Sequence, residues 1–189
     1  MSYSKPKNTC WTAMFSRTGY ELYCIIKKLK ILPTQIICNR KPIKDGIDER
    51  FWNFLQDQQY DITFVVKSPA AEEYDLFLQP PDRHVITLHG WMRIVPPTVC
   101  DKFNIYNGHP GDIVAYPELK GKDPQQKAHD LGHTTIGTVI HEVIPEVDNG
   151  PVLSTKKIKN TFKDVESISI ALREESIALW TDFLKQKIS

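Results

Sequence analysis

Residues 103–150 read FNIYNGHPGDIVAYPELKGKDPQQKAHDLGHTTIGTVIHEVIPEVDNG, and this stretch decides the fold. An apolar strand runs into Asn107 and His109. A second apolar strand, at residues 137–143, runs into a turn that holds Asp148. Open α/β sheets bind ligands beyond the carboxyl ends of their strands. We therefore expect these three polar side chains to lie together as a candidate catalytic group.

Strand-like and helix-like segments alternate through the rest of the chain. Strands are expected at residues 10–15, 34–38, 60–66, 84–88, around Ile105, at 137–143 and at 151–156. Helices are expected at residues 20–32, 48–56, within 68–82, at 124–129 and from Lys163 onward. This alternation predicts the α/β class, with a single doubly wound, mostly parallel sheet flanked by helices in a Rossmann-like arrangement. The 189 residues suit one domain, with residues 1–9 as a loose N-terminal segment.

Composition restricts the possible partners. Twenty-four basic and 23 acidic residues give a net charge of +1, which argues against a nucleic-acid partner. No apolar run approaches the roughly 18 residues that cross a bilayer, so we expect no membrane partner. The four cysteines are scattered without a C-x-x-C pair, which favours reduced, buried thiols in a cytoplasmic protein. The sequence leaves both a monomer and a homodimer open.

Several of these segments resemble the folate-dependent formyltransferases. The matching motifs are Asn-x-His-Pro at 107–110, YPELKG at 116–121 and TVIHEVIPEVDNGPVL at 138–153. Upstream, LHGWMRIVPP at 88–97 is similar to the folate loop of that family, and IICNR at 36–40 extends the resemblance weakly toward the N-terminus. The likeness is strongest to the branch that formylates glycinamide ribonucleotide in purine biosynthesis. It implies transfer of a formyl group from 10-formyltetrahydrofolate, as co-substrate, to a primary amine.

The apolar loop after the fourth expected strand has two interpretations. Its flat and polarisable side chains suit a planar ligand, but Trp91, Met92 and Ile94 can equally pack on the sheet. His141 has the same ambiguity between a ligand contact and the core. By resemblance, the folate site consists of Gly90, Met92, Arg93, Ile94, Val95, His141, Val143 and Val147.

The acceptor site is expected at the loop formed by Ser16, Arg17, Thr18 and Gly19, between the first strand and the first helix. A loop that opens a helix directs backbone N–H groups at an anion, yet a plain turn explains one glycine equally well. In the purine branch this loop is richer in glycine and holds the substrate phosphate. Glu175 resembles a family glutamate that contacts the substrate ribose, and a solvated pair with Glu174 is the alternative.

The three candidate catalytic residues are individually unremarkable as turn formers, but together they match acyl-transfer chemistry. The N–H groups of Asn107 and His109 can donate to a developing oxyanion, and Asp148 can orient His109 and pass a proton through water. A metal site is the rival interpretation. The spacings of His109, His129, His133 and His141 match no metal-binding motif, so we expect no metal.

The sequence leaves the amine acceptor open. Glycinamide ribonucleotide, a phosphorylated ribose, is the first choice, and a nucleotide-linked amino sugar is the second. Methionyl-tRNA formyltransferases carry further domains that these 189 residues do not include, which disfavours tRNA. A silent folate-binding module and a formylfolate hydrolase remain as alternatives from other functional classes.

Overall fold

The computed structural model describes residues 3–7, 9–40, 46–78 and 84–188. Its strands are β1 (Cys10–Phe15), β2 (Gln35–Cys38), β3 (Thr63–Phe64), β4 (His84–His89), β5 (Ile105–His109), β6 (Thr135–Glu142) and β7 (Val152–Lys159). Its helices are α1 (Tyr20–Leu29), α2 (Glu49–Asp57), α3 (Ala71–Phe77), α4 (Pro97–Lys102), α5 (Pro124–Asp130), α6 (Val165–Ile188) and the 3-10 turn η1 (Pro117–Leu119).

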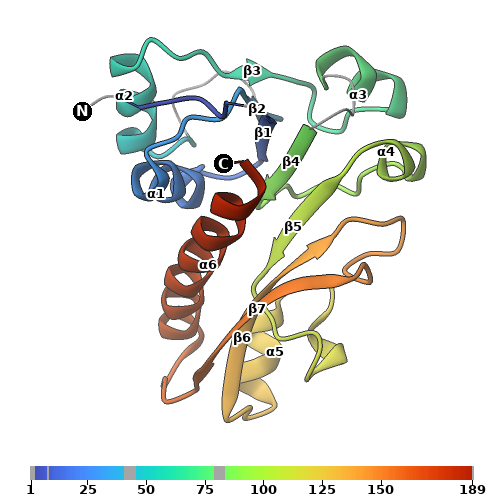
Figure 1. The fold of residues 1–189 in the computed structure, drawn as a ribbon. Coiled ribbons are helices and arrows are strands. Elements are labelled where there is room, and N and C mark those ends of the chain that lie inside the picture. Colours follow the sequence, from blue (N-terminus) through green and yellow to red (C-terminus); the bar gives the residue numbers. More distant parts are fainter. Residues whose placement is uncertain (1–2, 8, 41–45, 79–83, 189) are drawn as a thin grey trace.

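The seven strands form one sheet in the order β3-β2-β1-β4-β5-β6-β7 (Figure 1). Strands β1 to β5 pair in parallel, whereas β6 and β7 are antiparallel to their neighbours. The predicted single, mostly parallel sheet is therefore confirmed. The carboxyl ends of β1, β4 and β5 lie at one edge of the sheet, and β6 runs back along β5 so that His141 is opposite Asn107.

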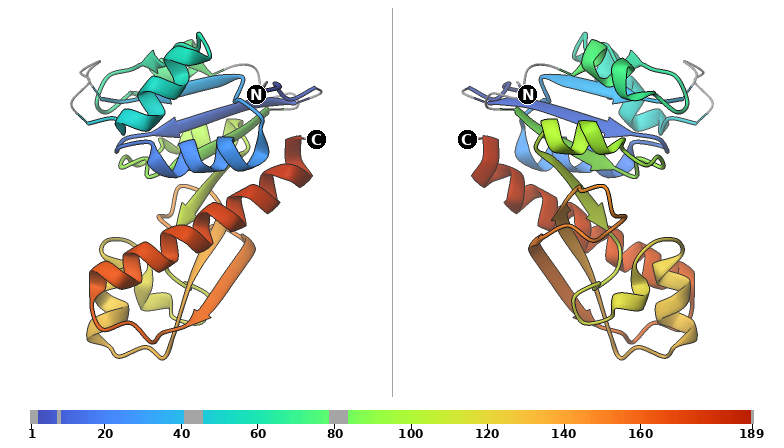
Figure 2. Two further views of the ribbon diagram at one scale, coloured as in Figure 1. Left: turned by 90° about the vertical axis from the view of Figure 1, so that its left-hand side faces the viewer. Right: turned by 90° about the vertical axis from the view of Figure 1, so that its right-hand side faces the viewer.

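Helices cover both faces of this sheet because the side chains of its central strands are apolar on both sides. Trp11, Ala13 and Phe15 of β1 pack in one cluster with α1, α2 and the end of α6. Met14 packs on the opposite face with α3 and α4. The two views of Figure 2 show these helix groups on opposite sides of the sheet. Continuous apolar runs are what a buried parallel strand requires.

Helix α6 runs along the molecule from the region of α5 and β6 to the region of α1, as Figure 1 shows. Its first turns pack with α5 and β6, and its later turns pack with α1. The predicted apolar stripe is confirmed, since each of its members is buried: Ile168, Leu172, Ile177, Trp180, Phe183 and Leu184.

Three local expectations differ from the structure. The third strand is confined to Thr63–Phe64, which pair with the last two residues of β2. Helix α4 was not predicted, although Pro97 occupies the first-turn position that favours a helix start. The four cysteines are free, but only Cys38 is buried, and the other three are partly exposed.

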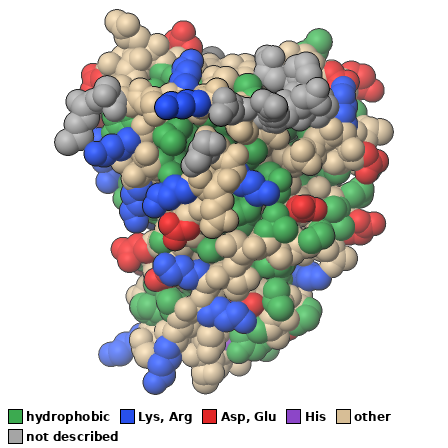
Figure 3. Space-filling model, viewed as in Figure 1, with side chains coloured by type: hydrophobic (Ala, Val, Ile, Leu, Met, Phe, Trp, Pro, Cys, Tyr) green, Lys and Arg blue, Asp and Glu red, His purple; other side chains and the backbone are tan. Residues whose placement is uncertain are grey.

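The surface carries no single-sign field on the side drawn in Figure 3, where acidic and basic side chains are interspersed. This agrees with the near-zero net charge. Across the described residues, no helix combines the length and the apolar character that a membrane span requires.

Candidate functional site

Strand β5 delivers Asn107 and His109 to the same side of the sheet. Successive side chains of a strand point to opposite faces, so Gly108 between them faces α6. A Cβ atom at Gly108 would lie 2.5 Å from Nε1 of Trp180. Glycine is thus required where α6 crosses the strand, and the two polar residues on either side of it are aimed together at the other face.

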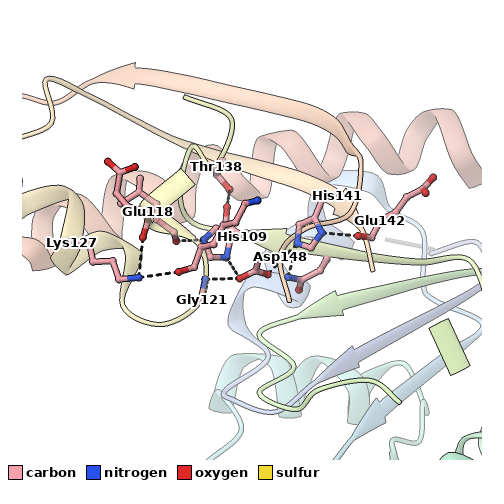
Figure 4. Close-up of polar contacts among 11 residues, drawn as sticks. His109, Glu118, Gly121, Lys127, Thr138, His141, Glu142 and Asp148 are labelled. Carbon is pink, nitrogen blue, oxygen red and sulfur yellow. Dashed lines mark hydrogen bonds and ion pairs between the residues drawn. The ribbon is translucent and has the colours of Figure 1, made fainter. Parts of the chain in front are cut away.

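Asp148 comes from the turn between β6 and β7, in a left-handed backbone conformation with φ 53°. Its Oδ2 accepts a hydrogen bond from the Gly121 backbone N–H at 2.9 Å and lies 3.3 Å from Nδ1 of His109. Its Oδ1 lies 3.4 Å from Nε2 of His141. These contacts, drawn in Figure 4, bring the carboxylate together with both imidazoles. A left-handed non-glycine residue stores backbone strain, which is characteristic of functional sites.

His109 is held on all sides by protein groups and is 5% exposed. Its Nε2 donates to the Leu119 carbonyl at 2.9 Å, and its own carbonyl accepts from the Thr138 hydroxyl at 3.1 Å. Burial lowers the pKa of His109 below its ordinary value, while the charge of Asp148 acts in the opposite direction. A neutral ring has one N–H for two facing acceptors, so uptake of a second proton completes both contacts.

His141 links Asn107 to Asp148. Its Nδ1 donates to the Glu142 carbonyl at 2.7 Å, which leaves Nε2 facing the Asn107 amide at 3.2 Å as well as the carboxylate. An unprotonated Nε2 accepts from the amide, whereas a protonated Nε2 donates to the carboxylate. The Asn107 amide nitrogen has two hydrogens, so one remains to donate to a ligand. Asn107 is also partly exposed, unlike the two histidines.

The Asp148 carboxylate is ionised at neutral pH. Burial acts to raise its pKa, but the contact with His141, the charge of His109 and the Gly121 N–H outweigh burial and lower the pKa below its ordinary value. The site therefore combines a fixed negative charge, an imidazole that can take up a proton and an amide donor. These are the groups that acyl transfer to an amine needs.

The connection between β5 and β6 fixes the Asp148 turn; the sequence predicted a helix there at residues 124–129 but no site residue. Lys127 donates to the carbonyls of Glu118 at 3.0 Å and Lys120 at 2.9 Å, as Figure 4 shows. Lys120 in turn contacts Asn149 beside Asp148. The one local signal in the sequence was Gly121, whose φ of 79° marks the turn that presents its N–H to the carboxylate.

The loop at residues 90–95 divides into a buried half and an exposed half. Trp91 and Val95 pack in the core, so for Trp91 the packing interpretation is correct. Met92 and Ile94 are instead 50% and 73% exposed. The Met92 N–H donates to the Ser16 hydroxyl at 2.9 Å. An exposed apolar rim beside a strand end suits a planar ligand.

The remaining predicted folate residues surround that loop or the Asp148 turn. Gly90 has φ 65° and lets the chain turn at the end of β4. Arg93 donates to the Lys67 and Met92 carbonyls, both at 2.7 Å. Val143 packs on the Trp91 cluster and hydrogen bonds through its N–H to Ile105, two residues before Asn107. Val147 is 55% exposed, next to Asp148.

In the loop from Ser16 to Gly19, polar groups already bond to other groups of the protein. Ser16 is buried, and its carbonyl accepts from Arg40 Nε at 2.6 Å. The Thr18 hydroxyl accepts from the Tyr20 N–H at 3.3 Å. Gly19 has φ 72°, and a Cβ there would lie 2.7 Å from the Phe51 ring. Arg17 is exposed, and its stem runs beside Gly90.

Glu175 is paired with Lys156 of β7 at 2.8 Å. The α6 residue that reaches the first turn of α1 is its neighbour Ser176, whose hydroxyl donates to Glu21 at 2.6 Å. Sequence reasoning missed both Ser176 and Glu21, which are 155 positions apart.

No cluster of three or more His, Cys, Asp or Glu residues suited to a metal ion occurs within the described ranges. Two of the histidines in the rival metal interpretation each contact one carboxylate: His129 lies 3.3 Å from Asp130, and His133 lies 3.3 Å from Glu118. His109 and His141 share the Asp148 carboxylate instead.

Comparison with known proteins supplies the family. A family model described as formyl transferase matches residues 53–178, which include Asn107, His109 and Asp148 but not the loop at Ser16–Gly19. A phosphoribosylglycinamide formyltransferase of Haemophilus influenzae is 29% identical over 112 residues, which are 58% of this chain and 51% of that protein. A methionyl-tRNA formyltransferase of Thermotoga maritima is 25% identical over 162 residues, which are 82% of this chain and 46% of that protein.

A similar fold occurs in a solved structure. The phosphoribosylglycinamide formyltransferase of Anaplasma phagocytophilum superposes with a TM-score of 0.78 at 21% identity, covering 95% of this chain and 86% of that one. The chain spans about half the length of the curated relatives it matches. Since the family match covers most of the sequence, the chain belongs to the formyl transferase family.

Proposed function

We propose that this protein transfers a formyl group from 10-formyltetrahydrofolate to a primary amine. The observation that carries the proposal is the cluster of Asn107, His109 and Asp148: His109 lies 3.3 Å from Asp148, and His141 joins Asn107 to Asp148 through contacts of 3.2 and 3.4 Å. All these residues fall within the part of the chain that matches the formyl transferase family.

The residues near this cluster fit a folate. Met92, Ile94 and Val147 offer exposed apolar surface, and Val143 connects the 90–95 loop to the β5 end through its packing and its bond to Ile105. The bound co-substrate would supply a formyl carbon that an amine can attack; the bond between that carbon and the folate nitrogen would then break, and the leaving nitrogen would take up a proton. The free N–H of Asn107 then donates to the formyl oxygen as negative charge develops on it.

His109 and Asp148 manage the proton that the amine releases. The ring is neutral at rest because burial lowers the pKa of His109, so its Nδ1 can take up a proton that reaches it through the Asp148 carboxylate. The ionised Asp148, 3.3 Å from Nδ1, stabilises the cation that forms. The Leu119 carbonyl on Nε2 holds the ring in the orientation that keeps Nδ1 on the carboxylate.

The acceptor we propose is glycinamide ribonucleotide, which the name of the Haemophilus relative supports. A nucleotide-linked amino sugar is the alternative that the assay distinguishes from it.

The function is tested by following loss of the formyl donor spectroscopically. Parallel samples contain glycinamide ribonucleotide, nucleotide-linked 3-amino and 4-amino sugars, methionyl-tRNA or no acceptor. We expect turnover that depends on one amine, and loss without any acceptor would identify a hydrolase instead. Asn107→Ala is expected to lower turnover about 10²- to 10³-fold, since it removes an oxyanion donor. Asn104→Ala, at the exposed residue just before the same strand, is the matched control; equal turnover in both variants would overturn the assigned mechanism.

A further inference from the structure

A buried ion pair lies just beyond the end of the catalytic strand, outside the contacts described above. Asp112 follows His109 by three residues, and its carboxylate is fully buried. Its Oδ2 lies 2.7 Å from Nζ of Lys157 on β7, whose side chain is partly exposed. Gly137 of β6 pairs with Lys157, and a Cβ atom at Gly137 would lie 3.2 Å from Cβ of Asp112. The sheet therefore leaves room for this carboxylate.

Asp112 also begins the segment that returns to the ring of His109. Its Oδ1 accepts from the Ala115 N–H at 3.1 Å, and its carbonyl accepts from the Tyr116 N–H at 2.9 Å. The Tyr116 carbonyl accepts from the Leu119 N–H at 3.0 Å. The Leu119 carbonyl in turn accepts from Nε2 of His109 at 2.9 Å. These bonds form a closed loop that starts three residues after His109 and ends on its ring.

The ion pair with Lys157 ties this loop to the sheet. A Cβ atom at Gly111 would lie 3.0 Å from Nε2 of His109 and 3.2 Å from Cβ of Leu119, so the loop packs tightly on the ring. The cost of burying charges offsets much of their attraction, and an apolar pair of similar volume often stabilises a protein as well. The position that the pair imposes on the loop therefore explains it better than stability does.

We propose, building on the proposed formyl transfer, that Asp112 and Lys157 are positioning residues that keep the Leu119 carbonyl on Nε2 of His109. That carbonyl requires a proton on Nε2, so Nδ1 of the neutral ring stays open toward Asp148. If the loop shifts, the ring can carry its proton on Nδ1 instead. The site then loses the proton acceptor that faces the carboxylate.

Charged groups from three other elements act on the His109 ring: Asp148, His141 and Lys127. Burial lowers the pKa of His109, whereas the Asp148 charge and the Leu119 carbonyl raise it. Loss of the Leu119 contact should therefore lower the pKa of His109 further. Removal of Lys157 alone would leave Asp112 as an unpaired negative charge, which favours the imidazolium and acts in the opposite direction. The pair must be removed as a whole, so that its own charges cancel from the comparison.

The test follows the His109 ring by NMR through a pH titration of the unliganded protein. The variant that combines Asp112→Asn with Lys157→Met removes both charges, and Lys157→Arg keeps them. Lys159→Met, at an exposed lysine two residues further along β7, is the matched control. We expect His109 in the double variant to titrate at lower pH than in the wild type, with nitrogen shifts showing part of the neutral ring protonated on Nδ1. Lys157→Arg and the control should match the wild type.

The same variants separate positioning from a purely structural role. The folded double variant should lose about 10- to 10²-fold in kcat, since a small misplacement of a catalytic group has a cost of that order. An unchanged His109 titration and tautomer would overturn the proposal, whatever happens to kcat, and so would an equal change in Lys159→Met. If the double variant does not fold, Asp112→Asn alone should show the same shift in smaller measure, and no shift there would overturn it too. The NMR measurements need no turnover, so the acceptor assay decides the proposed function separately.

Discussion

Replacing Asp148 with Asn tests the proton-handling part of the site most directly. The substitution keeps the shape of the side chain and one acceptor for the Gly121 N–H, but removes the negative charge 3.3 Å from His109. Asp148 is the main influence that raises the pKa of His109 against burial, so the variant ring becomes a poorer proton acceptor.

The size of the effect follows from the geometry. Both side chains are at most a tenth exposed, so solvent screens the pair weakly. An opposite charge within about 4 Å shifts a pKa by roughly 1–3 units, or about 1.4–4 kcal/mol. If His109 takes up the proton in the slow step, Asp148→Asn should lower kcat by about 10- to 10³-fold.

The assay is kcat at saturating formyl donor and acceptor, with folding checked by circular dichroism. Asp130→Asn is the control, because Asp130 lies at the same 3.3 Å distance from the exposed His129. We expect the control to retain wild-type turnover. An Asp148→Asn variant that is folded and turns over within about threefold of the wild type would refute the role of the His109–Asp148 pair.

Two further predictions concern stability. The pKa of His109 is lowered in the folded state, so the unfolded chain binds more protons below its ordinary pKa of about 6.5. The free energy of unfolding should therefore fall as pH drops from about 6.5 toward the pKa of His109 in the folded state. His109→Gln should remove this dependence of the unfolding free energy on pH, measured by urea titration at each pH. An unchanged pH dependence in the variant would contradict the role of His109. Gly108→Ala should cost about 1–3 kcal/mol of stability, because its Cβ would lie 2.5 Å from Trp180 Nε1. A smaller cost in a Trp180→Phe background would identify that contact as the cause.

The sequence alone predicted the parts of the fold that depend on local pattern. The apolar run at Cys10–Phe15 and the stripe along α6 follow from burial, which a periodic pattern reports directly. The extent of β3 could not be predicted from its own apolar run, because a strand is as long as its pairing with the neighbouring strand, here two residues.

The candidate site, too, was predictable only where it depends on local sequence pattern. Asn107 and His109 share a face because they are two apart on a strand, which spacing alone predicts. Asp148 is 39 positions beyond His109, and its place after a second expected strand, together with the resemblance, connected the two. The donors that fix the carboxylate turn, from Gly121 and Lys127, were missed because their roles depend on loop conformation. The contact of Ser176 with Glu21 likewise requires α6 to cross the sheet edge, which no local pattern reveals.

Strand β5 separates the two polar groups of this site physically. Asn107 and His109 face Asp148 on one side of the sheet, while Gly108 faces Trp180, which stacks on His89 on the other. The contacts of Glu21 with Ser176 and His89 can therefore change without moving the catalytic contacts, provided that residue 108 stays a glycine. The family match covers residues 53–178, so it includes Asn107, His109 and Asp148 but neither Glu21 nor the Ser16–Gly19 loop.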